Sequence, residues 1–300
     1  MALCELAKEH DDVLVLDADL AAATKTDIFK KAYPERFYDC GIAEGNMIGV
    51  AAGLAAAGMV PFAASFAMFA TGRAYEQVRN SVGYPHLNVK IAGSHAGISV
   101  GEDGATHQCC EDLALMRTIP GMVILNPADH YEMIAATKAA YEYKGPVYIR
   151  LGRLAIESFN DPDNYTFEIG KGITLEEGND VTVIATGLVV YEALKAVRAL
   201  REKGINARLI NMHTIKPIDK DIILKAAKET GKIITVEEHN IIGGLGEAVA
   251  AVTSESCPVP VYRIGVEDVY GHSGPAVGLL SEFGLDAAGL EKKITEFMNK

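Results

Sequence analysis

Cysteine is scarce in this sequence, and its arrangement excludes two common uses of the residue. The five cysteines are an odd number, and none shows the paired spacing of a metal-binding motif. We therefore expect neither a disulfide framework nor a cysteine-based metal site. The pattern is typical of a reducing compartment and predicts a cytoplasmic protein.

Positive charge is also in short supply. The 28 Lys and Arg residues are outnumbered by 40 Asp and Glu residues, which gives a formal net charge of −12 at pH 7. A chain this acidic is not expected to take nucleic acid or an anionic membrane as its main partner. An anionic ligand would need locally placed cations, so each arginine near a site counts.

The sequence has no convincing membrane segment. Residues 45–72 carry no charge and are long enough to span a bilayer, but Pro61 interrupts them, and many glycines and alanines make them weakly hydrophobic. Residues 1–10 predict an amphipathic helix rather than a secretion signal. We therefore expect no membrane partner.

Apolar strand segments instead alternate with helix segments along most of the chain. Val13–Leu16 is a continuous apolar run, as expected of a strand buried on both faces. Such alternation predicts parallel sheets covered by helices on both faces. The predicted strands are 13–16, 60–63, 87–92, 122–126, 147–150, 181–185, 207–211, 232–236 and 259–263, and the predicted helices are 44–58, 68–82, 109–119, 128–143, 190–203, 219–229, 246–254 and 290–298.

A polar, turn-rich stretch at residues 157–164 separates two such alternations. The fold class is therefore α/β, with two tandem three-layer α/β/α domains and mainly parallel sheets. We predict a first domain at residues 1–156, a linker at 157–178 and a second domain at 179–300.

The loop at residues 93–108 is the strongest candidate for a functional site. It holds two histidines, two carboxylates, three hydroxyls and four glycines, without Lys or Arg. It follows a predicted strand and precedes a predicted helix, the edge at which open α/β sheets place their ligands. Imidazoles and carboxylates exchange protons near neutral pH, so the loop predicts a binding or catalytic site.

The same loop resembles the signature of the transketolase family, S/T-H-x-x-x-x-x-G-E-D-G-x-T/S-H/Q. The resemblance continues on both sides, in order, over nearly the whole chain. The matching segments are Asp17-Ala18-Asp19, Gly41-Ile42-Ala43-Glu44, Thr214-Ile215-Lys216-Pro217 and Val236-Glu237-Glu238-His239.

The resemblance implies a pyrimidine-binding site for thiamine diphosphate. Glu44 opens an apolar helix, and from the residues alone it is either an ordinary first-turn acid or a carboxylate whose pKa is raised in an apolar site. By position it matches the family's acid, which bonds the pyrimidine ring and is catalytic. Phe66, with Phe69 beside it, matches the aromatic that stacks on this ring, and Asp19 matches a residue near the thiazolium. Arg73 is expected to form a salt bridge.

The resemblance also implies the groups that hold the substrate. His95 is the candidate for phosphate contact, Asp103 for a hydroxyl of the donor sugar, and His107 for its carbonyl end, with a catalytic role. Arg153 matches the family's phosphate-binding arginine, whose guanidinium suits a phosphate. Ala23 stands where some relatives carry a serine for phosphate.

One part of the family pattern is missing. Thiamine diphosphate enzymes hold the diphosphate through Mg or Ca, bound by a Gly-Asp-Gly motif and a later Asn, and this sequence has no such set. We therefore assign no metal ligand to this chain. The expectation is a split enzyme, whose N-terminal diphosphate-binding subunit is a separate polypeptide that carries the metal ligands.

The predicted function is that of the C-terminal subunit of a transketolase, which transfers a two-carbon ketol unit between sugar phosphates in carbohydrate metabolism, as in the pentose phosphate pathway. The expected assembly is a homodimer of this chain within a heterotetramer. Three alternatives stay open: a 1-deoxyxylulose-5-phosphate synthase-like enzyme, a 2-oxo acid dehydrogenase beta-type subunit, and a catalytically silent assembly subunit. The sequence does not identify the sugars.

Overall fold

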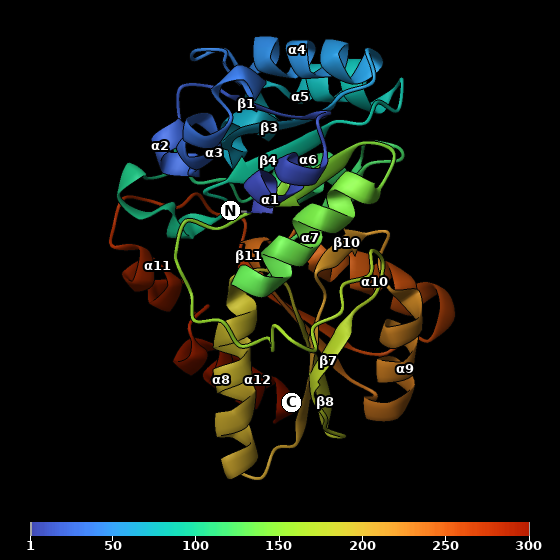
Figure 1. Ribbon diagram of the computed structural model, residues 1–300. Helices are drawn as coiled ribbons and strands as arrows, with labels where there is room; N and C mark the ends of the chain where they lie inside the picture. Colours follow the sequence, from blue (N-terminus) through green and yellow to red (C-terminus); the bar gives the residue numbers. More distant parts are fainter. Residues whose placement is uncertain (1, 300) are drawn as a thin grey trace.

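The strands form two sheets in the computed structural model, which describes residues 2–299 (Figure 1). The first sheet has seven strands in the order β10-β5-β6-β4-β3-β1-β2, and the second has five in the order β12-β11-β8-β9-β7. Neighbouring strands are parallel except at two edges, where β10 pairs with β5 and β7 with β9. The predicted fold class is confirmed.

The bounds of the elements are as follows. The strands are β1 (Val13–Asp17), β2 (Phe37–Asp39), β3 (Val60–Phe66), β4 (Lys90–Ser94), β5 (Val123–Leu125), β6 (Val147–Arg150), β7 (Ile173–Glu176), β8 (Val181–Ala185), β9 (Ala207–Asn211), β10 (Thr214–Lys216), β11 (Ile233–Asn240) and β12 (Val261–Val266). The α-helices are α1 (Ala2–Glu9), α2 (Ala21–Thr24), α3 (Asp27–Ala32), α4 (Glu44–Ala56), α5 (Tyr75–Gln77), α6 (Asp112–Arg117), α7 (His130–Glu142), α8 (Val189–Glu202), α9 (Lys220–Thr230), α10 (Leu245–Ser256), α11 (Ala276–Glu282) and α12 (Ala287–Met298).

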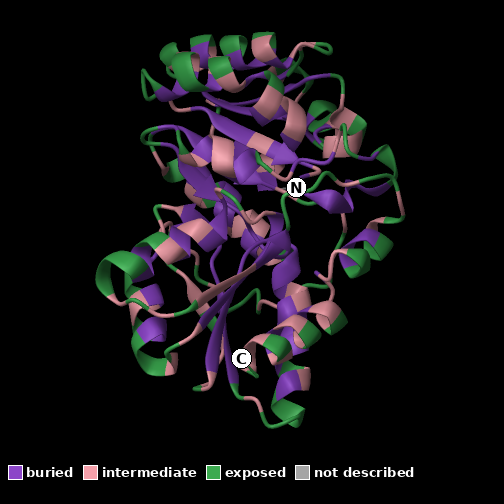
Figure 2. Ribbon diagram, turned by 180° about the vertical axis from the view of Figure 1, so that it is seen from behind, coloured by how far each residue is buried: buried purple, intermediate pink, exposed green. Residues whose placement is uncertain are grey.

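The first sheet is buried between two helical layers. Alternate residues of β1 point to opposite faces, so Val13 and Val15 pack with α1, α3 and α7, whereas Leu16 packs with α4 and α6. Both faces are therefore apolar, which explains the continuous apolar run seen in the sequence. Figure 2 shows the buried strands inside and exposed residues on the outer sides of the helices.

The second sheet is built in the same way. Val181, Val183 and Ala185 of β8 face α8 and α12, while Ile184 faces the side covered by α9 and α10. Figure 1 shows these two helix pairs on opposite sides of the sheet. The core of this side is continuous with that of the first domain, because Met212 and Ile215 belong to the same cluster as Leu113 and Met116.

Two findings go beyond the sequence prediction. The short strand β10 comes from the second half of the chain but pairs antiparallel with β5 of the first sheet. Strand β7 lies inside the predicted linker and forms the edge of the second sheet. The division at residues 157–178 therefore stays a prediction, and β10 and β7 were missed because short edge strands give little periodic signal.

The helix predicted at residues 68–82 is irregular. It consists of a π-helical turn η2 (Met68–Arg73), the short helix α5 and a second π-helical turn η3 (Val78–Gly83). At Gly72 there is no room for a side chain, because a Cβ there would overlap the end of the Met68 side chain. The hydroxyl of Thr71 donates a hydrogen bond to the carbonyl of Ala67 at 2.7 Å. Such turns gather at functional sites, and this one carries Phe69 and Arg73.

The chain also forms two short 3₁₀ turns, η1 (Pro34–Arg36) and η4 (Ile98–Asp103). Turn η4 lies inside the candidate loop at residues 93–108. Across residues 2–299, no helix combines the length and the apolar character needed to cross a membrane. Met1, part of the predicted N-terminal helix, lies outside the described residues.

Candidate functional site

The carboxyl ends of four neighbouring strands gather the predicted site residues. The order β4-β3-β1-β2 places Phe66 opposite Ser94 and Asp17 opposite Asp39. His95 follows directly on β4, and Asp19 follows β1. Parallel strands bring their carboxyl ends to one edge of the sheet, which is why residues distant in sequence share this edge.

Four aromatic rings from this edge form a contiguous cluster. The rings of Phe66 and His95 are stacked, with centroids 4.0 Å apart and an interplanar angle of 17°. Phe66 also lies parallel to Phe69 at 6.1 Å, and Phe69 meets the edge of His107 at 5.2 Å. The structure therefore brings together four of the residues that the sequence nominated.

Glu44 is tied to this ring cluster through Arg73. Its carboxylate is 1% exposed, and its Oε2 accepts a hydrogen bond from Arg73 Nη1 at 2.9 Å. The guanidinium of Arg73 also lies over the Phe69 ring, 4.5 Å from the centroid. The expected salt bridge of Arg73 is confirmed. Within the described chain, Oε1 of Glu44 has no hydrogen-bond partner.

These residues fit the aminopyrimidine end of thiamine diphosphate. A flat heteroaromatic ring needs an aromatic surface and a hydrogen-bonding acid, and Phe66, Phe69 and Glu44 supply both. The buried carboxylate keeps one oxygen without a partner among the described residues, so that oxygen is available to a ring nitrogen. In residues 2–299, no cluster of three His, Cys, Asp or Glu side chains has the arrangement of a metal site.

The environment of His95 keeps its imidazole neutral. Burial, together with the positive charge of Arg153, lowers the pKa of His95 to about 4, against a smaller opposing effect of Asp103. Nδ1 lies 3.1 Å from Ser94 Oγ. The backbone of His95 is left-handed, with φ of 56°, a conformation that is costly for a residue other than glycine. At neutral pH this residue is a hydrogen-bonding group rather than a charge.

Arg153 does not lie free at the site. Its Nη1 donates to Glu102 Oε2 at 2.8 Å and to the carbonyl of Val100. The side chain is 39% exposed and Glu102 is 67% exposed, so solvent screens the pair and the cost of separating it is small. The sequence did not predict that a carboxylate of the same loop would occupy this arginine.

The two aspartates predicted to contact substrate and cofactor, Asp103 and Asp19, make few contacts with the rest of the chain. Asp103 is exposed, and within the described chain its side chain makes no hydrogen bond or ion pair. Asp19 is also exposed and left-handed (φ 62°), and its N–H donates to Asp39 Oδ1 at 3.1 Å. The neighbouring Asp17 is structural, as expected: it is buried and accepts hydrogen bonds from Leu20, Thr24 and Thr26.

A cavity of about 430 Å³ lies apart from the ring cluster. Its walls come mainly from apolar side chains of α1, α3, α7 and residues 151–156, on the face of the first sheet to which Val15 and Phe62 point. Of the residues that line it, Ser94 is a direct neighbour of His95. None of the four clustered rings lines this cavity, so we do not include it in the candidate site.

Comparison with known proteins decides the family. The first part of the chain, residues 1–157, matches the family described as transketolase, pyrimidine binding domain, and residues 170–290 match transketolase, C-terminal domain. The chain belongs to the transketolase family. Its two α/β halves are therefore the pyrimidine-binding and C-terminal regions of a transketolase, as the motifs had indicated.

Individual relatives extend this finding to split enzymes. The chain is 52% identical to a protein of Methanocaldococcus jannaschii provisionally named transketolase C-terminal section, over 99% of this chain and 94% of that protein. It is 45% identical to the 6-deoxy-6-sulfo-D-fructose transketolase subunit SqwH of Clostridium sp. strain MSTE9, over 99% and 93%.

A solved structure agrees with the sequence relatives. It is described as a split gene transketolase, inactive beta4 tetramer, and superposes with a TM-score of 0.92 at 49% identity, over 99% of this chain and 96% of that one. This transketolase-family chain thus corresponds to the C-terminal subunit of a split enzyme. Membership of the family implies a transferase that depends on thiamine diphosphate.

Proposed function

We propose that this chain is the subunit that activates thiamine diphosphate in a split transketolase, which transfers a two-carbon ketol unit from a ketose to an aldose. The observation that carries the proposal is the buried carboxylate of Glu44 beside the Phe66–Phe69 rings. The cofactor, when bound, supplies the nucleophilic carbon and stabilises the transferred fragment. This chain supplies the acid, the stacking surface and the substrate contacts.

Each residue has a distinct task in this proposal. Glu44 would form a hydrogen bond to a nitrogen of the pyrimidine ring through Oε1, while Arg73 fixes the orientation of the carboxyl group through Oε2. Phe66 and Phe69 stack on the ring and exclude water. His107 serves the carbonyl end of the donor sugar as a general acid or base. Asp103 accepts a hydrogen bond from a hydroxyl of that sugar, and Asp19 is assigned to the surroundings of the thiazolium.

The proposed substrate class rests on one cation and one neutral hydrogen-bonding group at the loop. The guanidinium of Arg153 and the neutral imidazole of His95 suit the anionic end of a sugar phosphate. Because Ala23 replaces the serine that some relatives use for phosphate, a sugar with another anionic end, such as a sulfonate, is the second candidate. The similarity to a 6-deoxy-6-sulfo-D-fructose transketolase subunit favours testing it.

Replacing Arg153 with alanine should weaken binding of the anionic end. A charge-assisted hydrogen bond contributes roughly 1.5–3 kcal/mol, so the KM for xylulose 5-phosphate should rise about tenfold to a hundredfold. The KM for an unphosphorylated two-carbon donor should change little. Steady-state assays of the assembled enzyme with both donors make the comparison, and a parallel set with 6-deoxy-6-sulfofructose tests the sulfonate.

Glu102→Gln is the matched control for this change. It removes the carboxylate that now pairs with Arg153 and leaves the guanidinium in place. The KM for the phosphorylated donor should stay the same or fall. An equal rise of KM for both donors in Arg153→Ala would instead mean that the arginine is structural or that the substrate carries no anionic end.

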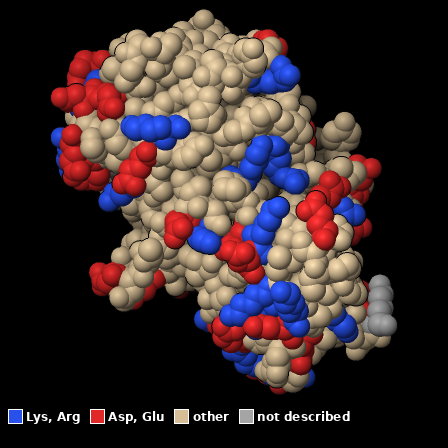
Figure 3. All heavy atoms as spheres, turned by 90° about the vertical axis from the view of Figure 1, so that its right-hand side faces the viewer, with Lys and Arg blue, Asp and Glu red and all other residues tan. Residues whose placement is uncertain are grey.

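The partners in this proposal are an N-terminal diphosphate-binding subunit and a second copy of this chain. We place the Mg or Ca ligands on the former, because the Gly-Asp-Gly pattern with its later Asn is missing from this sequence. The self-interface is placed on α4, whose Gly49 and Gly53 are exposed beside the half-exposed Val50. On the face that Figure 3 draws, the upper middle carries few Lys, Arg, Asp or Glu side chains, whereas charged side chains gather at its left and right margins.

Gly53→Leu tests this interface without disturbing the fold of one chain. A Cβ at Gly53 or Gly49 would meet no atom of another described segment within 4 Å, so there is open space for a side chain at this position of one chain. In a close helix contact it would overpack the interface, at a cost of about 1–3 kcal/mol. Light scattering should show a smaller particle with the same melting temperature, and activity with the partner should fall in parallel.

Lys228→Leu is the control, because it adds a leucine to an exposed position of another helix, α9. It should change neither particle size nor activity. A wild-type chain that is monomeric, yet active with its partner at the same concentration, would rule out the proposed interface.

A further inference from the structure

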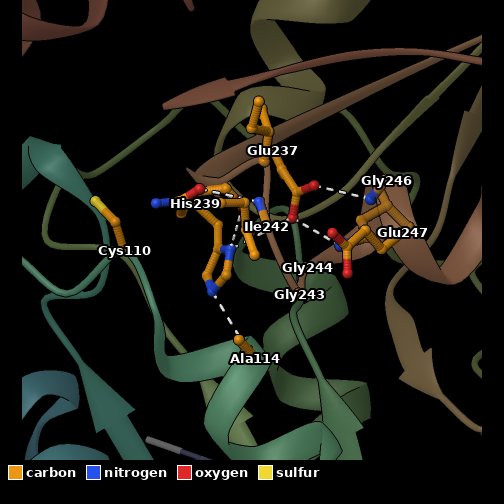
Figure 4. A network of polar contacts seen from close by, with 12 residues as sticks. Cys110, Ala114, Glu237, His239, Ile242, Gly243, Gly244, Gly246 and Glu247 are labelled. Atoms are coloured by element: carbon orange, nitrogen blue, oxygen red, sulfur yellow. Dashed lines mark hydrogen bonds and ion pairs between the residues drawn. The ribbon is translucent and has the colours of Figure 1, made fainter. Parts of the chain in front are cut away.

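Strand β11 carries three consecutive buried ionisable residues, Glu237, Glu238 and His239. Figure 4 shows how Glu237 and His239 lie: the first reaches the start of α10 and the second reaches α6. Glu237 accepts hydrogen bonds from the N–H groups of Leu245 at 2.7 Å and Gly246 at 2.8 Å, while His239 Nε2 accepts one from Ala114 at 3.3 Å. Glu237 therefore has a structural task as the cap of a helix.

Glu238 has different neighbours, because successive side chains of a strand point to opposite faces. Its Oε1 accepts a hydrogen bond from the N–H of Ser99, at 2.6 Å, in the loop of residues 95–107 that carries the two site histidines. Gly97 lies so close that a Cβ there would be 2.3 Å from Glu238 Cδ. A carboxylate of the second domain thus contacts the site loop directly.

The loop needs such support, because it is costly to order. His95 is a non-glycine residue with a φ of 56°, a conformation that persists only where the surroundings fix it. Gly97, Gly101 and Gly104 adopt positive φ without strain, but glycine loses more conformational entropy on ordering than any other residue. A second tie acts at the other end, where Gln108 Nε2 donates to the carbonyls of Ile98 and His272, both at 3.0 Å.

Stability alone does not account for Glu238. Burial raises its pKa, which reports the cost of holding this carboxylate away from water. By strict hydrogen-bond geometry its Oε2 and the hydroxyl of Ser99 are both buried without a partner in the described chain, although the Ser99 side chain is near enough to lower the Glu238 pKa. Burying this acid costs folding free energy, and the hydrogen bond that its side chain makes goes to the backbone of the site loop.

We propose that Glu238 is a positioning residue: it clamps the backbone at Gly97–Ser99 and so fixes His95 and His107 against the cofactor-binding rings. The role assigned to the loop rests on the proposed function, whereas the clamp itself does not. The C-terminal domain then takes part in catalysis indirectly, by setting the shape of a loop on the first domain.

Amide hydrogen exchange of the chain tests the clamp directly. Glu238→Ala should raise the exchange rates of residues 96–104 about tenfold, the effect of losing one hydrogen bond to a charged group. Glu238→Gln should change them much less, because an amide oxygen still accepts from Ser99. Gly97→Ala, which displaces Glu238 and also places a side chain at a φ of 84°, should raise the same rates. If Glu238→Ala does not fold, Glu238→Asp decides the question, because it keeps the charge but draws the carboxylate back from Ser99 and should also raise these rates.

Glu237→Ala is the matched control, since it removes the adjacent buried carboxylate. It should lower the melting temperature and speed exchange at the start of α10, but not in the loop. Unchanged loop exchange in Glu238→Ala and Gly97→Ala, or an equal rise in Glu237→Ala, would overturn the clamp.

The consequence for activity is measured in the complex with the diphosphate-binding subunit. Glu238→Ala should lower kcat about tenfold while the Kd of thiamine diphosphate stays unchanged, and Glu238→Gln should recover most of the loss. Equal kcat in wild type and Glu238→Ala would refute the positioning role. If wild-type complex transfers no ketol unit, the proposed function fails, and the exchange experiment still decides whether Glu238 clamps the loop.

Discussion

Glu44→Gln is expected to remove most of the turnover of the assembled enzyme. Glutamine keeps an oxygen for Arg73 and nearly the same volume, but its amide cannot act as the acid that we propose for Glu44. Loss of a positioned acid–base group typically lowers the rate by about 10²–10⁴. Single-turnover and steady-state assays of the complex measure this loss, and the chain should melt at nearly the wild-type temperature.

Asp221→Asn is the control for the other interpretation of Glu44. Asp221 is also an acid in the first turn of a helix, α9, but it is exposed and far from the site in sequence. If Glu44 served only the helix dipole, both variants would lose a little stability and neither would lose activity. Full turnover in Glu44→Gln would mean that Glu44 only stabilises the N-terminus of α4 through the helix dipole.

Asp112→Ala should give the largest loss of stability. Asp112 and Arg150 are both buried, at 0% and 4% side-chain exposure, and are joined by hydrogen bonds of 2.7 and 3.2 Å. Tyr148 donates a third hydrogen bond to the carboxylate, at 2.8 Å. Removing the acid leaves a buried guanidinium without its counter-ion, which typically costs about 3–5 kcal/mol. Urea unfolding followed by circular dichroism measures the change.

Two comparisons sharpen this prediction. Lys8→Ala breaks the exposed pair with Glu5 and should leave the unfolding midpoint nearly unchanged. The double variant Asp112→Leu, Arg150→Met replaces the buried pair by apolar side chains and should recover much of the lost stability. An Asp112→Ala chain as stable as the wild type would mean that Arg150 finds another counter-charge or reaches water.

The pH dependence of this pair has a definite sign. Burial by itself raises the pKa of Asp112, but the positive charge of Arg150 and the hydrogen bonds outweigh burial and hold that pKa below its ordinary value of 3.8. A depressed acid contributes stability that is fully present above the unfolded-state pKa and is lost as the pH falls through the folded-state pKa. The Asp112–Arg150 pair therefore stabilises the chain at neutral pH, and this contribution to the free energy of unfolding is lost only in acid, below pH 3.8.

The sequence predicted the parts of the fold that repeat. Strands such as Val13–Asp17 are apolar on both faces because helices cover both sides of the sheet, so their position is evident without any tertiary information. Strand β10 was not predicted, because it is defined by its partner β5. The π-helical turns within residues 68–83 were not predicted either, because the apolar pattern of the sequence does not distinguish them from an α-helix.

The candidate site was predictable to a similar extent. Loop residues such as His95 and His107 could be nominated because their chemistry is concentrated in one stretch of sequence, and the structure brings their rings together with those of Phe66 and Phe69. Contacts between residues far apart in sequence could not be predicted. Arg73 contacts Glu44 across 29 residues, and the sequence predicted a salt bridge of Arg73 without naming its partner. Glu238 contacts Ser99 across 139 residues, and no pattern in the sequence indicated this contact.

The central claim is that this chain supplies the acid and the substrate contacts of an enzyme completed by a second subunit. The most direct measurement adds a purified diphosphate-binding subunit to this chain, with Mg²⁺ and thiamine diphosphate, and follows transfer from xylulose 5-phosphate to ribose 5-phosphate. We expect no transfer by either subunit alone, and activity that rises with added partner until the two are equimolar. Transfer by the highly purified chain alone, or none by the equimolar mixture with any anionic ketose donor, would contradict the account.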